Sequence, residues 1–245
     1  MKPIAIVQHE ADVGPGQFSD YLDARGWPSE LIHVHAGQPI PRSAERYSGI
    51  CSLGGSMSVN DPLPWIEDEV ALIRDADARR VPVIGHCLGG QLIARAFDAR
   101  VARAEFKEFG WRHVEIEGRE LALEWLGTER VHCELFQWHE DSFDLPRDAR
   151  RLLTGALCSN QAFIIQRPGY AHLAMQFHVE MTPALIRSWL ADPVAVRDIM
   201  REREHGASTG VQSPAEIERD VELRTERMGA VATRLYDRWS EGLRR

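Results

Sequence analysis

The sequence predicts an α/β protein of three layers, in which a mostly parallel central sheet carries helices on both faces. Three observations lead there. Short apolar runs alternate with helical stretches through the first hundred residues, as in βαβ units. One apolar run, 81–86, ends in a glycine-flanked cysteine that opens a helix. The chain has 245 residues, of which 44% are hydrophobic, enough for one full core and a short appendage.

The elements follow from composition and periodicity. In the first half we expect strands at 3–8, 30–35, 47–53 and 81–86. Helices are expected near 17–25 and over 64–80, the second because Trp65, Val70 and Ile73 fall near helical spacing. Shorter β-type runs follow at 112–116, 131–138, 151–157, 162–166 and 171–177. The second half should therefore be rich in strands that return to the sheet.

The chain becomes helical and charged after residue 180. Thr182 and Pro183 suit a helix cap and first helical residue, and the pair at 192–193 repeats that signal. The stretch 206–213 predicts a linker, and SPAE at 213–216 predicts a capping box. A last helix follows, with an apolar stripe that must dock on the domain, on a second subunit or on a partner. The stripe consists of Ile217, Val221, Met228, Val231, Leu235 and Trp239.

Composition excludes several classes of function. The net charge of −8 argues against a nucleic-acid surface, and no apolar run is long enough to span a membrane. The chain opens on a strand instead of a charged leader, so we expect a cytoplasmic protein. The widely spaced cysteines 51, 87, 133 and 158 fit reduced thiols, and His139 with Asp141 lacks a third metal ligand. No metal or cofactor is expected. Residues 53–61 lack the lysine of a phosphate loop, so no separate nucleotide-binding domain is indicated.

Cys87 is the clearest candidate for chemistry. Gly85 and Gly89 remove side chains that would block a sharp turn from strand to helix around it. The turn places the thiol at a helix N-terminus, where free backbone amides favour the attacking thiolate. Such a nucleophile needs a base, and the base needs an acceptor. His178 and Glu180 supply both: on a strand, residues two apart share a face.

Two of these segments resemble a known family. GHCLGGQLIA at 85–94 and QFHVE at 176–180 are similar to the Gly-x-Cys-x-Gly-x-Gln elbow and His-x-Glu segment of class I, or triad-type, glutamine amidotransferases. The resemblance covers roughly residues 1–190 and implies a flavodoxin-like catalytic domain there, with 191–245 as a helical C-terminal extension. It implies Cys87 as nucleophile, His178 as base and then acid, Glu180 as the orienting carboxylate, and Gln91 as a contact to bound glutamine.

Further segments extend the resemblance. SLGGS at 52–56 looks like the family's glycine-rich oxyanion strand, which implies that the amides of Gly55 and Leu88 hold the oxyanion. Segments 138–146 and 159–163 look like the stand-alone branch similar to the GMP synthase amidotransferase domain. That likeness implies three residues lining the glutamine pocket: Asn160, Gln161 and Phe163. Val179 stands where the family usually has proline, which should perturb only the local geometry.

The resemblance implies hydrolysis of the glutamine γ-amide through a glutamyl thioester, with ammonia passed to an acceptor. About 55 residues follow the triad, too few for a synthase, so the acceptor would sit on a partner synthase. One alternative is a stand-alone hydrolase of γ-glutamyl amides or peptides. Another is a catalytically silent regulatory protein on this scaffold, which the intact triad disfavours. Homo-oligomerisation stays open, and His9, His33, His35 and His172 are assigned no role.

Overall fold

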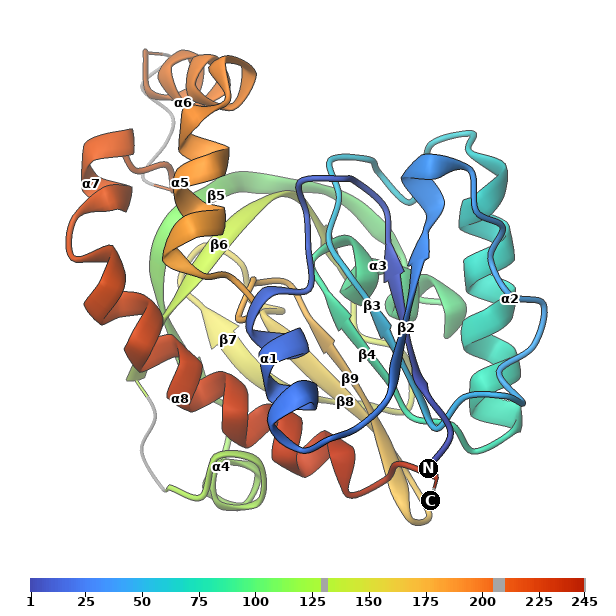
Figure 1. Ribbon diagram of the computed structural model, residues 1–245. Helices are drawn as coiled ribbons and strands as arrows, with labels where there is room; N and C mark the ends of the chain where they lie inside the picture. The colour runs from blue at the N-terminus through green and yellow to red at the C-terminus, as the bar shows by residue number, and fades with distance from the viewer. Residues whose placement is uncertain (129–131, 205–209, 245) are drawn as a thin grey trace.

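The computed structural model describes residues 1–128, 132–204 and 210–244, and within them helices cover both faces of one large sheet (Figure 1). The strands are β1 Ile4–Gln8, β2 Ser29–His33, β3 Gly49–Ser52, β4 Val83–His86, β5 Val101–Ile116, β6 His132–Phe143, β7 Ala149–Gly155, β8 Ala162–Arg167 and β9 Tyr170–Met175. The α-helices are α1 Gly16–Ala24, α2 Pro64–Ala78, α3 Leu88–Ala96, α4 Arg119–Leu126, α5 Pro183–Ala191, α6 Pro193–Glu204, α7 Pro214–Glu218 and α8 Val221–Ser240. A short 3₁₀ helix, η1 Val34–Ala36, follows β2.

The sheet is mixed, so the prediction of a mostly parallel sheet is wrong. Its order is β2-β1-β3-β4-β9-β8-β7-β5-β6. The first five strands in that order pair in parallel, and β8, β7, β5 and β6 continue in antiparallel pairings. The reason lies in the connections. Arg167 pairs with Tyr170 across a two-residue turn between β8 and β9, and so short a link can join only antiparallel strands.

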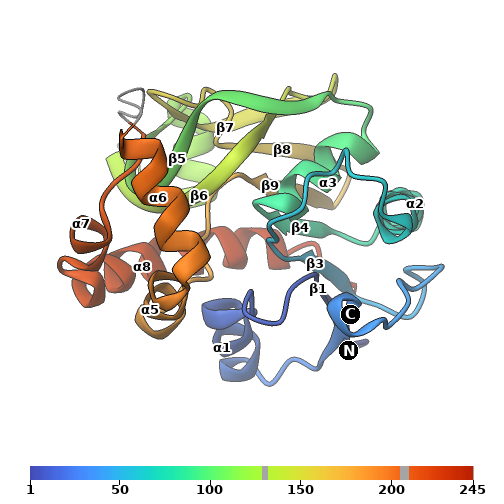
Figure 2. The ribbon, with the colours of Figure 1, turned by 90° about the horizontal axis from the view of Figure 1, so that it is seen from above.

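Each face of the sheet has its own apolar core, which makes the predicted three layers. Strand β1 shows how one strand serves both: Ile4 and Ile6 pack in one core, Ala5 and Val7 in the other. Successive side chains of a strand point to opposite faces, so a strand covered on both sides is apolar throughout. The first core receives α1, α4, α5 and α8, and the second receives α2 and α3 (Figure 2).

The C-terminal helices lie against this sheet. The stripe of the expected last helix faces the same chain: α8 contacts α1, α4, β6 and β9, and the stripe is buried except for a half-buried Val231. The expected single helix is two helices, because Asp220 adopts a left-handed backbone with φ 55° between α7 and α8. Aspartate tolerates that conformation better than most residues. The capping box of Ser213 and Glu216 is confirmed.

Several predicted boundaries need correction. The expected strand at 112–116 is the end of β5, which begins at Val101. The pairing of β5 with β6 shifts register between Arg103 and Glu108, and this shift breaks the alternation of charged and apolar residues along β5. Strand β9 ends at Met175, so the His-x-Glu segment lies in the following loop and not on a strand. Of the expected linker, 206–209 lies outside the described residues, and Val211 forms a bridge to Phe109 of β5. Residue 131 of another expected strand is also outside the described residues.

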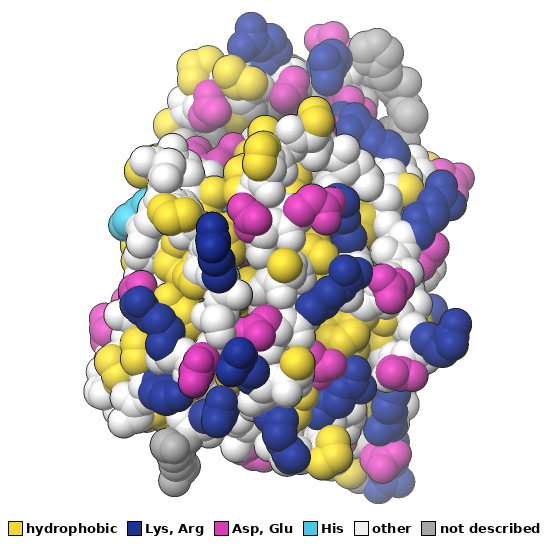
Figure 3. All heavy atoms as spheres, turned by 90° about the vertical axis from the view of Figure 1, so that its right-hand side faces the viewer, with side chains coloured by type: hydrophobic (Ala, Val, Ile, Leu, Met, Phe, Trp, Pro, Cys, Tyr) yellow, Lys and Arg dark blue, Asp and Glu magenta, His cyan; other side chains and the backbone are white. Residues whose placement is uncertain are grey.

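No helix within the described residues is long and apolar enough to cross a membrane. Figure 3 shows the face that lies on the right in Figure 1, and on it basic and acidic side chains are interspersed. That face, in a chain of net charge −8, does not offer the concentrated positive charge that phosphate backbones require.

Candidate active site

The candidate residues gather because they follow neighbouring parallel strands. Strands β1, β3, β4 and β9 are adjacent in the sheet, and their carboxyl ends meet at one edge. Ligands of open α/β sheets bind at such an edge. Gly55 lies just beyond β3, Cys87 just beyond β4, and His178 just beyond β9. The sheet thus brings together residues that are 91 positions apart in sequence, between Cys87 and His178.

The turn at Cys87 is the sharp elbow that the glycines predict. Cys87 has φ 50° and ψ −109°, a strained backbone for a residue with a side chain, at a cost of about 1–3 kcal/mol. Its amide donates to the Met175 carbonyl oxygen at 2.8 Å, which ties the elbow to β9. A Cβ at Gly89 would collide with Ser52, and one at Gly90 with Met175. Both glycines are therefore needed to fit the start of α3 between β3 and β9.

His178 lies between a carboxylate and the thiol. Its Nδ1 is 2.6 Å from Glu180 Oε1, and its ring lies close enough to the Cys87 thiol for that side chain to help raise the pKa of His178. Since Nδ1 faces Glu180, the nitrogen that faces the thiol is Nε2. All three side chains are buried: Cys87 is 5% exposed, His178 2% and Glu180 0%. A thiol, an imidazole and a carboxylate in this order are the groups that a cysteine hydrolase requires, so the three stay our candidates for nucleophile, base and orienting acceptor.

Electrostatics favour the charged forms of both His178 and Glu180. Burial lowers the pKa of His178, but the negative charges of Glu180 and Cys87 outweigh it and raise that pKa to about 10. Burial raises the pKa of Glu180, whereas the neighbouring imidazoles of His178 and His86 leave it below its ordinary value. An imidazolium held by a carboxylate can give a proton to a leaving group at neutral pH.

The imidazole is also fixed sterically. Trp189 of α5 meets the His178 ring edge-on, with centroids 5.2 Å apart and planes at 90°. On another side, a Cβ at Gly54 would lie 2.7 Å from His178 Cε1, so only glycine fits there without displacing the ring. The backbone amide of His178 donates to the Phe136 carbonyl oxygen at 2.9 Å. Sequence reasoning gave Trp189 and Gly54 no place at the site, because neither belongs to a chemical motif.

A buried histidine of the elbow connects Glu180 to the C-terminal helix. His86 Nε2 lies 3.8 Å from Glu180 Oε2 and 3.1 Å from the Tyr236 hydroxyl oxygen of α8. Burial lowers the pKa of His86. Glu180 Oε2 has no hydrogen-bond partner among the described residues. Helix α8 therefore closes the back of the triad, a relation between residues 180 and 236 that the sequence did not indicate.

The two amides expected to hold an oxyanion are placed differently. Gly55 lines the cavity that contains Cys87, whereas Leu88 is the buried first residue of α3. Within the described residues, neither amide hydrogen has a hydrogen-bond acceptor. The first amides of a helix are free in this way and attract negative charge.

The cavity beside Cys87 and His178 has a volume of about 450 Å³. Gln91 lines it, with Nε2 directed at the Asp141 carbonyl oxygen, 3.3 Å away. Six of the lining residues are acidic, and Arg103 is the one lysine or arginine among the described residues that line the cavity. The lining carboxylates are Glu10, Asp12, Glu140, Asp141, Asp192 and Asp198. A positively charged group of a ligand would be favoured here.

Asn160, Gln161 and Phe163 do not line this cavity. Gln161 is fully buried and donates to Glu108 Oε2 at 2.7 Å, and Phe163 packs edge-on against Phe143. Asn160 donates to the Phe143 carbonyl oxygen and lines a separate surface hollow. The structure therefore places none of these three side chains in the lining of this cavity, and their direct contact with glutamine stays a prediction.

His139 lines the cavity but points its ring nitrogens at protein atoms. Its Nε2 lies 3.1 Å from Glu108 Oε2, and its Nδ1 lies 3.1 Å from the Asp141 carbonyl oxygen. Glu108, His139 and Cys158 offer ligand atoms within 4.8 Å of one another. Glu108 Oε2 already lies within hydrogen-bond distance of His139 Nε2 and accepts from Gln161 Nε2. The cluster is thus explained as a buried hydrogen-bond network.

Several known proteins are similar to this chain. A crystal structure of a glutamine amidotransferase from Methylobacillus flagellatus is 38% identical, covers 100% of this chain and 96% of its own, and superposes with a TM-score of 0.90. A glutamine-hydrolysing GMP synthase subunit from Thermoplasma acidophilum is 28% identical over 63% of this chain and 76% of its own length. Gamma-glutamyl peptidase 4 of Arabidopsis thaliana is 27% identical over 61% of each chain.

The family model for glutamine amidotransferase class-I matches residues 17–192, which include the elbow and the His-x-Glu segment. The match covers most of the α/β sheet and both sides of the candidate site. The chain therefore belongs to the class I glutamine amidotransferase family.

Proposed function

We propose that this protein hydrolyses the γ-amide of glutamine with Cys87 as nucleophile and delivers the ammonia to an acceptor on a partner synthase. One observation carries the proposal: the His178 ring lies between the Cys87 and Glu180 side chains, beside a cavity, with its Nδ1 2.6 Å from Glu180 Oε1. Family membership supports amide hydrolysis in general.

In the proposed mechanism, Cys87 Sγ attacks the γ-carbonyl carbon, a C–S bond forms, and negative charge moves to the oxygen. The Gly55 and Leu88 amides stabilise this oxyanion, each donor lowering the barrier by roughly 3 kcal/mol. His178 Nε2 then gives its proton to the nitrogen as the C–N bond breaks and ammonia leaves. Water, deprotonated by His178, attacks the thioester, and glutamate and the Cys87 thiolate are released.

The cavity offers charges of both signs to the rest of the substrate. Free glutamine carries an α-ammonium and an α-carboxylate group; six carboxylates line the cavity as candidate partners for the first, and Arg103 is the candidate for the second. Gln91 supplies a neutral amide beside the reacting centre. Its hydrogen bond to the Asp141 carbonyl oxygen, at 3.3 Å, is long enough to be exchanged for a substrate atom.

The partner is inferred from relatives. The T. acidophilum relative is by its name one subunit of a GMP synthase, and its similarity supports a partner synthase here. We place the reaction in the cytoplasm, where the free cysteines 51, 87, 133 and 158 would stay reduced.

A second function is favoured by the cavity's size. Its volume of about 450 Å³ falls in the range of roughly 300–1,000 Å³ that is typical of sites for drug-sized ligands. Such ligands are larger than free glutamine. A γ-glutamyl amide or peptide would fill more of it, with an amine leaving in place of ammonia. The similarity to a γ-glutamyl peptidase points the same way.

The test is a comparison of substrates on the purified protein and its Cys87→Ala variant. We expect glutamate and ammonia from glutamine with the wild type alone. Release from γ-glutamyl amines or dipeptides, with glutamine inert, would favour the second function. If neither protein acts on any substrate, the chain is a silent scaffold. If the wild type and Cys87→Ala are equally active, the nucleophile assignment is wrong.

A further inference from the structure

Another buried histidine–carboxylate pair lies outside the cavity, next to the glycine-rich segment 52–56 that follows the end of β3. His9 follows β1, and its Nε2 is 2.7 Å from Glu69 Oε2 of α2. Both side chains are fully buried. The other oxygen of Glu69 accepts from the Ser52 hydroxyl group of β3 at 2.6 Å. The pair thus links three elements that surround the segment from Ser52 to Gly55.

The remaining ring nitrogen of His9 contacts the backbone of the segment 52–56. His9 Nδ1 is 3.1 Å from the carbonyl oxygen of Gly54. That oxygen and the amide hydrogen of Gly55 belong to one peptide group, which is planar and trans. In a trans peptide the N–H points opposite to the C=O. Any group that fixes the Gly54 oxygen therefore also fixes the direction of the Gly55 N–H.

We infer that His9, held by Glu69, is a positioning residue that orients the Gly54–Gly55 peptide so that the Gly55 amide serves the oxyanion. The inference rests on the proposed function, since it concerns the same reaction. His9 touches neither the substrate cavity nor Cys87 and acts only through the peptide.

The protonation of the pair suits this role. For His9 to meet both Glu69 and the Gly54 oxygen as a donor, both ring nitrogens must carry hydrogen. Burial lowers the pKa of His9, but Glu69 and the hydrogen bond to Gly54 outweigh it, and the pKa is raised. The hydroxyl group of Ser52 donates to the other oxygen of the Glu69 carboxylate. The Nδ1–H therefore stays directed at Gly54.

The surroundings leave His9 little freedom. Its ring stacks on Trp65 with centroids 4.9 Å apart and planes at 26°. A Cβ at Gly55 would lie 2.9 Å from Leu88 Cδ2 and 3.3 Å from His9 Cβ, so the peptide is confined between the elbow and His9. A rigid donor against a confined peptide is the preorganisation that oxyanion stabilisation needs.

Two matched variants separate this role from simple packing. In His9→Asn the amide nitrogen can occupy the position of Nδ1 and still donate to Gly54, while the contact with Glu69 is lost. In His9→Gln the amide nitrogen reaches the position of Nε2 and keeps Glu69, while the contact with Gly54 is lost. If His9 served only packing, its contact with Glu69 would matter most, and His9→Gln would be the milder variant. If His9 positions the peptide, His9→Asn is the milder variant.

We expect His9→Gln to lower kcat on the order of 100-fold with KM little changed, and His9→Asn to stay within about 10-fold of the wild type. Alkylation of Cys87 by iodoacetamide forms no oxyanion, so its rate should be the same in both variants. Higher kcat in His9→Gln than in His9→Asn would overturn the inference. A parallel fall in the alkylation rate would do the same, because it would mean a damaged triad.

A crystal structure of His9→Gln gives a readout that does not depend on activity. We expect the Gly54–Gly55 peptide to be rotated or disordered there and ordered in His9→Asn. An unchanged peptide in His9→Gln would overturn the inference. A wild type that cleaves no glutamine or γ-glutamyl compound would reject the proposed function instead, and the peptide's orientation would still decide the role of His9.

Discussion

Two histidine–carboxylate pairs stand at opposite ends of β9 and show what separates a structural pair from a catalytic one. His172, inside the strand, pairs with Asp77 at 3.0 Å, and His178, three residues beyond its end, pairs with Glu180 at 2.6 Å. Both imidazoles are buried. The two pairs are equivalent in residue type, but the Asp77 side chain is 24% exposed whereas that of Glu180 is fully buried.

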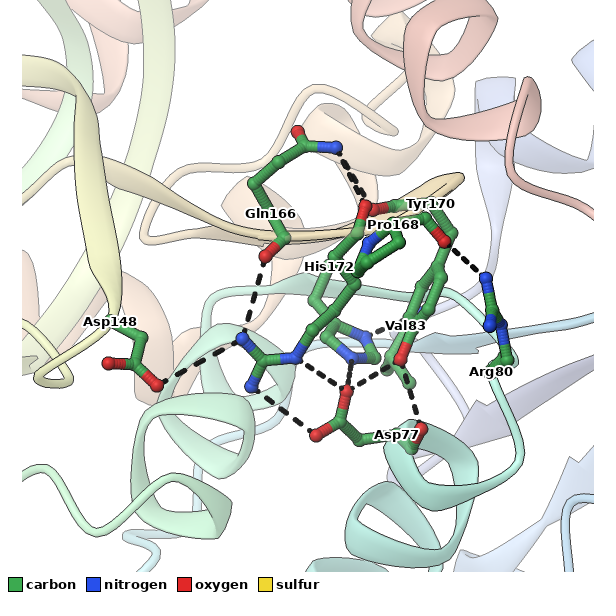
Figure 4. A network of polar contacts seen from close by, with 9 residues as sticks. Asp77, Arg80, Val83, Asp148, Gln166, Pro168, Tyr170 and His172 are labelled. Atoms are coloured by element: carbon green, nitrogen blue, oxygen red, sulfur yellow. Dashed lines mark hydrogen bonds and ion pairs between the residues drawn. The ribbon is translucent and has the colours of Figure 1, made fainter.

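Their hydrogen bonds differ. His172 Nδ1 accepts from the Val83 amide at 3.0 Å, and its Nε2 faces Asp77, so both ring nitrogens are occupied (Figure 4). Asp77 also accepts from Arg167 and the Tyr170 hydroxyl group, which ties α2 to the hairpin of β8 and β9. Burial lowers the pKa of His172 and favours the neutral ring.

His178 keeps one nitrogen for chemistry. Glu180 occupies Nδ1, Nε2 faces Cys87, and the ring lines the cavity. Its pKa is raised where that of His172 is lowered. The difference teaches that a free ring nitrogen next to a cavity, together with a second charge beside it, distinguishes the catalytic candidate from a buried structural pair.

The largest expected effect comes from replacing each histidine by asparagine. His178→Asn keeps a donor toward Glu180 but removes the nitrogen that faces Cys87, so kcat for amide hydrolysis should fall roughly 10,000-fold or more. His172→Asn keeps the acceptor for Val83 and should leave kcat within about 10-fold. Glutamate release measures both, and similar losses would erase the proposed distinction.

Glu180→Gln tests the charge beside His178 and should lower kcat roughly 100- to 10,000-fold. The His178 proton is needed for the leaving group, so wild-type activity should fall as pH rises through about 10. Without the negative charge of Glu180 the pKa of His178 drops, and this alkaline limit should move to lower pH. A pH–rate profile with the same alkaline limit in both proteins would contradict this account.

Gly54→Ala tests the steric fit of the His178 ring. The new Cβ would lie 2.7 Å from His178 Cε1, so the imidazole must shift, and we expect kcat to fall about 100-fold. Gly14→Ala is the matched control, because a Cβ there meets nothing within 4 Å. Equal activity of the two variants would show that the ring can move without loss.

Asp77→Asn should affect activity least and stability most clearly. It weakens the contacts with His172, Arg167 and Tyr170, and we expect the free energy of unfolding at pH 7 to fall by about 1–3 kcal/mol. These contacts hold the pKa of Asp77 below its ordinary 3.8, so its contribution is present above pH 3.8 and lost as pH falls further. Urea unfolding should show the gap between the proteins closing in acid; a constant gap would contradict this.

The sequence anticipated the parallel half of the molecule well. Strands β1, β3 and β4 are buried on both faces, so they read as unbroken apolar runs, and glycines mark the elbow. It did not anticipate the full length of β5, in which half-exposed and charged positions interrupt the apolar pattern. It also gave no sign of the break at Asp220, which depends on one residue's backbone conformation.

The candidate site divides in the same way. Residue type and spacing predicted Cys87, His178 and Glu180 as a candidate triad, because a nucleophile, its base and an acceptor have few chemical alternatives. They did not indicate that Gln161 and its neighbours lie outside the lining of the cavity, and they gave no role to His9. The partners of Gln161 and His9 are Glu108 and Glu69, which lie 53 and 60 residues away along the chain.

By itself, then, the sequence determined the family and supplied the candidate triad, since both depend on short local patterns. The tertiary structure alone decided which strands run antiparallel, which side chains reach the cavity, and which of the buried histidines keeps a free nitrogen beside the thiol. Those outcomes depend on contacts between segments distant in sequence, which local patterns do not encode.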